Sequence, residues 1–349
     1  MSTISINGRL IGPDHPVYII AEMSANHNQN FDAAVELIHI AKECGVDAIK
    51  LQTYTPDTLT LNCDNEYFKI GKGTLWEGRT LHDLYGEAMT PWEWQPKLMK
   101  IANELGLDLF STPFDATAVD FLEEMDVPVH KIASFEIVDI PLIKKIAATG
   151  KPVIMSTGMS TLSEIDEAVS AFRKAGGKEL LLLKCTSAYP APPESMNLKT
   201  IQNMQQTFGL PCGLSDHSMG IEIPVAAVAL GACVIEKHFI KARSDGGPDS
   251  AFSLEAPELK AMVEAIRNTE KALGRVNYQI TEKENAGKIF RKSIFISTDA
   301  AEGDAVSAEN IRCVRPGYGL HTRHYEELIG RKFRKAVKAG TPLSWDLVI

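Results

Sequence analysis

The sequence predicts a (β/α)8 barrel, because eight short apolar runs alternate with helix-period stretches between residues 17 and 239. Near-continuous apolar strands separated by helices are typical of parallel β/α units with both sheet faces covered. Nearly every run ends in a polar or charged residue, and a barrel gathers these strand ends into one active-site face. The runs are 17–22, 48–52, 109–114, 129–134, 153–158, 180–187, 212–217 and 234–238.

The helices between these runs have recognisable starts and stops. The stretch beginning near Asp32 carries apolar residues at helical spacing, and Gly45 provides its C-terminal stop. A later helix is expected to have Ser163 as its N-cap and a Gly-Gly pair at 176–177 as its stop. Residues 256–274 predict the helix that closes the barrel.

One connection is unusually long, with 56 residues between Gln52 and Leu109. Loops of this length are usually functional or disordered. The aromatic content of this loop argues against disorder. We therefore expect loop 55–90 to form a wall or lid over the pocket. Its aromatic residues and the one that leads into it are Tyr54, Tyr67, Phe68, Trp76 and Tyr85.

The length of 349 residues leaves room for a barrel of about 250 residues and a small extra domain. We predict a barrel domain at 1–280, a polar linker at 281–288 and a small, turn-rich domain at 289–349. Residues 281–349 hold 12 Lys and Arg against 9 Asp and Glu, whereas the remainder holds 24 against 36. The acidic barrel argues against nucleic-acid binding.

Composition also bears on the compartment. No apolar run approaches the ~20 residues of a membrane span, so no membrane association is expected. The first residues lack a basic region followed by an apolar one, so no signal peptide is indicated. The six cysteines are scattered without a CxxC motif, which is typical of reduced thiols in a cytoplasmic protein.

Two histidines end consecutive strands, His217 in SDH and His238 in EKH. Neighbouring strand ends would bring the two imidazoles close enough to share a divalent cation with open positions for water or substrate. The alternative is a pair of unrelated structural histidines. Structural zinc is not expected, because no cysteine cluster supplies closed coordination.

Two lysines, Lys50 and Lys131, end the second and fourth strands. A buried ammonium is costly unless it meets an anion, so these groups predict a phosphate or carboxylate site. Lys184 is ambiguous, because strand alternation can send it outward. Hydroxyl side chains end most of the other strands, at Ser111, Thr112, Ser134, Ser156, Thr157, Ser187 and Ser215.

Carboxylates lie at the same strand ends. Glu22 ends the first strand and Glu136 follows the fourth, where either could act as a general acid or base. The alternative is that they are ion-pair partners of the two lysines. Gln52 could hydrogen-bond a polyol, and Asp249 could hold a sugar hydroxyl or form a turn.

At these residues the chain resembles the sialic acid synthase family, whose members condense phosphoenolpyruvate with an amino sugar. The resemblance covers essentially the whole chain, and the tail resembles an antifreeze-like (SAF) domain. Within the family the chain is most similar to the pseudaminic acid synthases, through AEMSANHN, TYTPDTLTLN and GTLWEGRTLHDLYGEAMTPWEW. The shared motifs are IIAEMSANHN, AIKLQTY, FSTPF, HKIAS, STGM, LKCTSAYP, GLSDHS, ALGACVIEKHF and RPGYG. Ser187 stands where the N-acetylneuraminate branch carries Asn.

The resemblance implies a role for each candidate residue. His217 and His238 would bind Mn2+, or else Mg2+ or Co2+, and Glu22, Lys50 and Lys131 would be catalytic. Phosphoenolpyruvate would be held by Lys50, Thr112, Lys131, Ser134, Ser156, Ser187 and Ser215. The sugar would be held by Gln52, Glu136, Tyr189, Asp249 and Arg315, with Arg315 reaching across from the partner in a domain-swapped homodimer.

The implied reaction joins phosphoenolpyruvate, 2,4-diacetamido-2,4,6-trideoxy-L-altrose and water to give pseudaminic acid and phosphate. Such acids usually decorate bacterial surface glycans or flagella. Alternative acceptors are N-acetylmannosamine and a legionaminic acid precursor. A 3-deoxy-ulosonate-type synthase, a metal aldolase and a non-enzymatic sugar-binding module are further alternatives.

Overall fold

The computed structural model describes residues 2–71, 73 and 76–349. Over these residues the chain divides into two compact units, Met1–Gly274 and Arg275–Ile349. The segment 281–288, which the sequence suggested as a linker, is helical, with α11 at Glu282–Gly287. Its N-cap is Thr281, and Glu284 completes a capping box, so the sequence carried a helix signal here.

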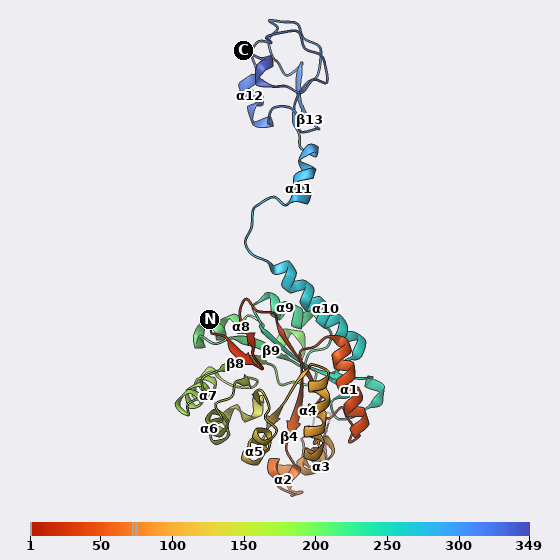
Figure 1. The fold of residues 1–349 in the computed structure, drawn as a ribbon, viewed down its shortest axis with the longest axis vertical. Coiled ribbons are helices and arrows are strands. Elements are labelled where there is room, and N and C mark those ends of the chain that lie inside the picture. The colour runs from red at the N-terminus through yellow and green to blue at the C-terminus, as the bar shows by residue number, and fades with distance from the viewer. Residues whose placement is uncertain (1, 72, 74–75) are drawn as a thin grey trace. The chain divides into compact units, whose positions relative to one another are not determined.

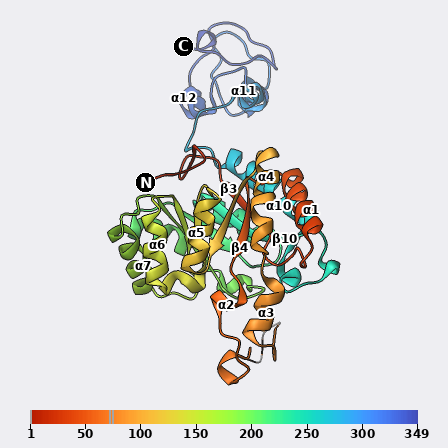
Figure 2. The same ribbon diagram turned by 60° about the horizontal axis from the view of Figure 1, so that its bottom comes forward.

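The first unit is a closed barrel, as the sequence predicts. Its last strand, β10, pairs with both β9 and β3, which joins the two ends of the sheet. All pairings around the barrel are parallel, and helices surround the strands (Figures 1 and 2). The barrel strands are β3 (Tyr18–Glu22), β4 (Ala48–Thr53), β5 (Asp108–Pro113), β6 (His130–Ile132), β7 (Val153–Ser156), β8 (Leu180–Cys185), β9 (Cys212–Asp216) and β10 (Val234–Ile240). A two-residue strand, β11 (Leu254–Glu255), adds to β10.

The outer helices follow the predicted strand–helix alternation. Gly45 ends α1 in the left-handed conformation with φ of 81°, as its predicted role as a stop requires. Thr161, rather than Ser163, is the N-cap of α7, because Glu164 completes a capping box with Thr161. The helices are α1 (Phe31–Cys44), α4 (Gln95–Glu104), α5 (Ala116–Glu124), α6 (Ile140–Ala148), α7 (Leu162–Lys174), α8 (Thr200–Phe208), α9 (Glu222–Ala229) and α10 (Ala256–Leu273).

Strand alternation sorts the barrel side chains into two sets. One apolar cluster includes Ile20, Phe110 and Ile154 from the strands, whereas a second joins Ile49 and Leu182 to the surrounding helices. Because side chains alternate along a strand, the polar residues that continue the first set point into the carboxyl end of the barrel. This alternation directs Glu22, Thr112 and Ser156, which follow Ile20, Phe110 and Ile154 by two residues, into the same end of the barrel.

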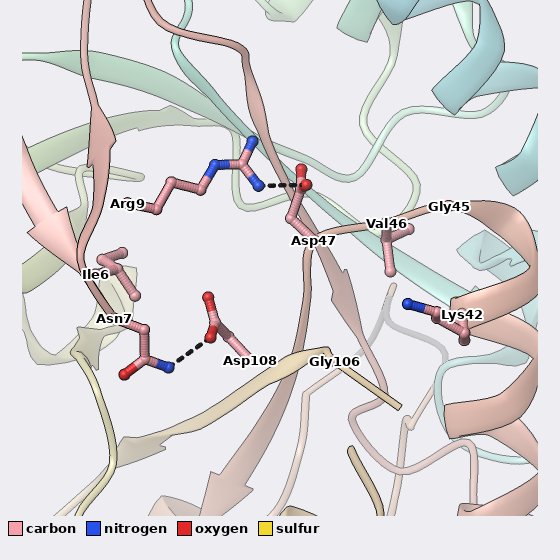
Figure 3. A pocket seen from close by; sticks show the side chains of 9 residues that line it. All are labelled: Ile6, Asn7, Arg9, Lys42, Gly45, Val46, Asp47, Gly106 and Asp108. Carbon is pink, nitrogen blue, oxygen red and sulfur yellow. Dashed lines mark hydrogen bonds and ion pairs between the residues drawn. The ribbon is translucent and has the colours of Figure 1, made fainter. Parts of the chain in front are cut away.

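The amino end of the barrel carries a hairpin that our sequence analysis missed, β1 (Ile4–Ile6) and β2 (Arg9–Ile11). Its signal was the Asn7-Gly8 turn, in which both residues have positive φ, 47° and 77°. A polar cavity of 490 Å³ lies beside the hairpin, where Arg9 pairs with Asp47 and Asn7 donates to Asp108 (Figure 3). Asp47 and Asp108 lie at the amino ends of β4 and β5, so these contacts tie the hairpin to the barrel on the face opposite the carboxyl ends of the strands.

The long connection between β4 and β5 is structured. It contains α2 (Pro56–Leu59), the 3-10 turn η1 (Glu66–Phe68), α3 (Leu81–Ala88) and the 3-10 turn η2 (Trp92–Trp94). An antiparallel bridge joins Lys69 to Thr80. Lys72, Thr74 and Leu75, which belong to the predicted wall, lie outside the described residues.

The second unit has its own apolar core. Two antiparallel strands, β12 (Ser293–Ile296) and β13 (Ile311–Val314), are accompanied by α12 (Tyr325–Leu328) and 3-10 turns. Its fully buried side chains include Ile294, Phe333 and Leu343. Within the described part of the chain, no helix of either unit is both long and apolar enough to cross a membrane.

Candidate active site

Four charged side chains alternate in sign inside the carboxyl end of the barrel. Lys50 Nζ lies 2.6 Å from Glu22 Oε2 and 3.8 Å from Glu236 Oε1, and Lys131 Nζ lies 3.7 Å from Glu236 Oε1. All four are buried. Such charges are tolerated away from water only because each has an opposite partner. The alternative reading of Glu22 as an ion-pair partner is therefore correct, and it does not exclude a catalytic role.

Glu236 is the functional residue that our sequence analysis missed. Its carboxylate lies between the two lysines and accepts a hydrogen bond of 3.1 Å from Ser215 Oγ. The signal was present, because Glu236 and His238 are two residues apart on β10 and share a face. The intervening Lys237 lies on the other face, where it pairs with the buried Asp216.

A group of hydroxyls lies around Lys131. Lys131 Nζ donates to Ser156 Oγ at 2.7 Å, and Ser134 Oγ accepts from the backbone N–H of Gly158 at 3.0 Å. A Cβ at Gly158 would collide with the hydroxyls of Ser134 and Ser187, so both hydroxyls lie directly against the Gly158 backbone. Lys50 Nζ donates to Thr112 Oγ1 at 3.3 Å, which brings a further predicted anion ligand to the second lysine.

Thr157, whose hydroxyl donates to the backbone carbonyl of Leu183 at 3.0 Å and contacts Met204 of α8, faces away from the anion site, and two further residues named from the sequence also lie elsewhere. Ser111 faces outward and shares a 2.6 Å hydrogen bond with Thr53 on the helix side of the sheet. Lys184 alternates with the inward-facing Leu183 and donates to the carbonyl of Cys185 and the hydroxyl of Thr186. These two side chains are therefore not part of the anion site.

The carboxyl groups have different proton affinities. Burial raises the pKa of Glu22 to about 7, although Lys50 partly offsets it, and burial likewise raises the pKa of Glu136 to about 7. The pKa of Glu236 is lowered, because Lys131 and Lys50 together outweigh its burial. Carboxyl groups held at different protonation states in one site are typical of acid–base chemistry, in which one can carry a proton at neutral pH.

The two histidines predicted to bind a metal lie close together. Their ring centroids lie 5.3 Å apart. His217 Nδ1 lies 3.0 Å from the carbonyl oxygen of Thr186, which can only accept, so Nδ1 carries a hydrogen. Burial lowers the pKa of His217, but Cys185 and the Thr186 carbonyl outweigh it and raise the pKa, so Nε2 has a free lone pair in the neutral form of the ring only. His238 Nδ1 is buried without a hydrogen-bond partner, and burial holds its pKa well below the usual range, in the neutral form that binds metals.

The donor set beside these histidines is small. Over the described ranges, no group of three or more His, Cys, Asp and Glu side chains is arranged as a metal cluster. An ion held by these two imidazoles alone would have its other coordination positions open to water or substrate. Two protein ligands with open positions suit a catalytic metal rather than a structural one.

A cavity of 450 Å³ opens beside His238 and has two contrasting sides. Its polar side contains Ser24, Gln52, Glu136, His238 and Asp249. The long connection supplies most of the apolar side, through Tyr54, Leu59, Ile70, Trp76, Leu81, Leu84, Tyr85 and Ala88. Loop 55–90 therefore forms a wall of the cavity, as its aromatic content indicated.

The residues predicted to hold the sugar are mostly brought together. Gln52, Glu136, Tyr189 and Asp249 all line this cavity. Tyr189 also packs against His217, with ring centroids 4.4 Å apart and the rings tilted by 44°. Arg315 lies in the second unit with its side chain exposed, so its predicted contact with the sugar of a partner subunit stays a prediction.

Comparison with known proteins agrees with this geometry. The NeuB family matches residues 37–278, and the SAF domain matches residues 291–349. Pseudaminic acid synthase from Helicobacter pylori is 45% identical over 95% of this chain and 97% of its own. N,N'-diacetyllegionaminic acid synthase from Legionella pneumophila is 36% identical over 99% of this chain and 98% of its own.

A solved structure shows the same architecture. The N-acetylneuraminic acid synthetase of Leptospira borgpetersenii is 34% identical and matches with a TM-score of 0.72, over 82% of this chain and 95% of its own. The family match spans most of the barrel, and the curated relatives span nearly the whole chain. The chain therefore belongs to the NeuB family and ends in a SAF domain.

Proposed function

We propose that this protein is a pseudaminic acid synthase, which condenses phosphoenolpyruvate with 2,4-diacetamido-2,4,6-trideoxy-L-altrose and water. The observation that carries this proposal is the 45% identity to a pseudaminic acid synthase over 95% of the chain, against 36% to a legionaminic acid synthase. The apolar wall supports it, because a trideoxy sugar with N-acetyl groups presents methyl groups to such a surface.

The lysines and hydroxyls account for the phosphoenolpyruvate half of the reaction. Lys50 and Lys131, with Thr112 and the serines around Gly158, supply cations and donors for a phosphate and a carboxylate. Glu236 keeps the two ammonium groups apart and compensated until the anion arrives. Fixed charges of this kind stabilise charge that moves during the reaction without reorganising.

Proton transfer falls to Glu22 in this proposal. The C3 carbon of phosphoenolpyruvate bonds to the aldehyde carbon of the open sugar, water adds at C2, and the C–O bond to phosphate then breaks. The attacking water loses a proton and the aldehyde oxygen gains one. A carboxyl with a pKa of about 7 can accept and return that proton near neutral pH.

His217 and His238 would hold a divalent metal, with Mn2+ as our first choice and Mg2+ or Co2+ as alternatives. When bound, the ion would supply Lewis-acid polarisation of the aldehyde. The hydrogen bond of His217 Nδ1 to the Thr186 carbonyl, which leaves Nε2 to bind a metal in the neutral form, and the unpartnered Nδ1 of His238 support this assignment.

We also propose a domain-swapped homodimer, in which the second unit caps the cavity of the partner and Arg315 contacts the sugar. Its exposed guanidinium and the opposite net charges of the two parts of the chain support this arrangement. The product would serve surface or flagellin glycosylation, and the free cysteines suit a reducing cytoplasm.

The direct test is phosphate release from phosphoenolpyruvate with three acceptors, each with Mn2+ and with EDTA, followed by mass spectrometry of the product. The acceptors are the trideoxy-L-altrose, its legionaminic counterpart and N-acetylmannosamine. Metal-dependent turnover of the altrose sugar supports the proposal. Turnover of another acceptor alone would keep the chemistry and change the substrate, and no release with any acceptor would overturn the synthase assignment.

A further inference from the structure

Ser24 has a backbone conformation that its residue type disfavours. It follows β3 with φ of 46°, in the left-handed region, and its side chain is buried. Outside glycine this region is uncommon, and such residues persist where the surrounding structure requires them, often at functional sites. The side chain of Ser24 lines the cavity described above.

The Ser24 hydroxyl joins two polar groups of that cavity. It donates to Asp249 Oδ2 and accepts from Gln52 Nε2 at 2.9 Å. The same Gln52 nitrogen donates to Glu22 Oε1 at 3.0 Å, so both of its hydrogens are used within the site. Because the two hydrogen bonds fix the amide nitrogen, the amide oxygen of Gln52 also has a fixed orientation, in which it can accept a hydrogen bond from a sugar hydroxyl.

Asp249, on the loop that follows β10, is held by the turn at Ser24 on the loop that follows β3. Its carboxylate accepts from Ser24 and also from the backbone N–H of Ala25, the residue that follows Ser24. A carboxylate with two fixed donors presents its remaining lone pairs in a set orientation. A ligand that meets it loses less free energy to ordering than one that meets a mobile carboxylate.

We propose that Ser24 is a positioning residue for the acceptor sugar, and that its hydroxyl fixes Asp249 and Gln52 in the orientation that binds sugar hydroxyls. This inference rests on the proposed function, because it takes the acceptor to be the ligand of the cavity. Ser24 contacts the two residues rather than the reacting atoms, so it acts on acceptor affinity more than on chemistry.

Ser24→Gly is an informative variant, because glycine removes the hydroxyl and adopts the left-handed conformation without strain. We expect the acceptor KM to rise about tenfold or more, which is the loss typical of one hydrogen bond to a charged group. The KM for phosphoenolpyruvate should stay within about twofold, and Tm should not fall. Ser24→Asn should restore much of the acceptor KM, since Asn tolerates this conformation and its amide can donate to Asp249.

A matched control is Asp14→Gly, which replaces another residue of positive φ, 67°, at the amino end of the barrel. It should leave both KM values unchanged. If Ser24→Gly keeps the wild-type acceptor KM, or weakens both substrates together with a lower Tm, Ser24 has no positioning role. Absence of product from the wild-type chain with every acceptor would instead overturn the proposed function.

Discussion

The carboxylate of Glu236 lies 3.7 Å from the ammonium nitrogen of Lys131, in the buried interior where the substrate phosphate or carboxylate is expected. The Glu236 carboxylate thus lies beside the same lysines that are proposed to bind the anionic groups of phosphoenolpyruvate. Removing one partner of a buried pair leaves an uncompensated charge, which typically destabilises by about 3–5 kcal/mol.

Glu236→Gln should therefore lower the Tm of the ligand-free protein, and added phosphoenolpyruvate should raise it more than in the wild type. Thermal unfolding with and without phosphoenolpyruvate measures both effects. Lys338→Gln, at an exposed ion pair of the second unit, is the control and should change neither. A variant as stable as wild type without ligand would show that the lysines do not depend on Glu236.

Glu22→Gln should reduce kcat by a factor of about 10²–10⁴, the usual contribution of a general acid or base, while the KM for phosphoenolpyruvate changes little. The amide keeps the size of the carboxyl but cannot transfer a proton. Any inflection near pH 7 in the rate profile that belongs to Glu22 should disappear, because its pKa is raised to about 7. Equal losses in kcat and in phosphoenolpyruvate affinity would remove the acid–base role.

His217→Ala and His238→Ala should each abolish tight Mn2+ binding, measured by calorimetry on the purified protein, together with metal-stimulated turnover. Either change removes one of the two imidazoles that the site offers. His324→Ala, in the second unit, provides a matched histidine control that should bind the ion normally. Full metal stimulation in one of the first two variants would exclude that histidine from the site.

Glu136→Gln should stabilise the protein more at pH 8 than at pH 5. Burial raises the pKa of Glu136 to about 7, from about 4.3 expected in the unfolded chain. The protonated form is thus favoured by folding, and its contribution is present below the unfolded pKa and lost as pH rises through 7. The gain at pH 8 has an upper bound of about 4 kcal/mol. Urea unfolding at the two pH values measures it, and an equal effect at both would contradict a raised pKa.

The apolar wall predicts discrimination against a hydroxymethyl group on the acceptor. A hydrophobic pocket rejects an added hydroxyl by about 10²-fold, so kcat/KM should favour the 6-deoxy sugar over its 6-hydroxy analogue by that factor. Ile70→Ser should reduce the preference, because Ile70 lines the cavity. Leu61→Ser, at a residue 62% exposed in the same connection, should leave it intact. If Ile70→Ser leaves the ratio of the two kcat/KM values unchanged, the apolar wall does not determine which acceptor is used.

Much of this arrangement could be predicted from sequence, because parallel strands buried on both faces are apolar runs with abrupt polar ends. The runs ending at Glu22 and His238 therefore located their strands within about two residues. Glu236 was missed because it lies inside such a run, where a charged side chain was not expected to be buried. Its neighbours Lys50 and Lys131, from other strands, make that burial tolerable, and only the fold brings them together.

Two elements that our sequence analysis missed are specified by local sequence signals alone. The Asn7-Gly8 turn and the Thr281 capping box each specify their element without distant partners, so both could have been found. The proposed role of Ser24 could not have been found in this way, because its partner Asp249 is 225 residues away in the sequence. Its positive φ could not be predicted either, because serine is not a residue type that indicates this conformation.

The pairing of Glu22 opposite His238 across the seam between β3 and β10 has a consequence for synthesis of the protein. During synthesis, one edge of β3, the first barrel strand, stays unpaired until β10, the eighth, has been made. Until residue 238 leaves the exit tunnel, a nascent chain holds both lysines and one histidine but not the second. A chain truncated before residue 238 therefore lacks both the strand that closes the barrel and the second histidine.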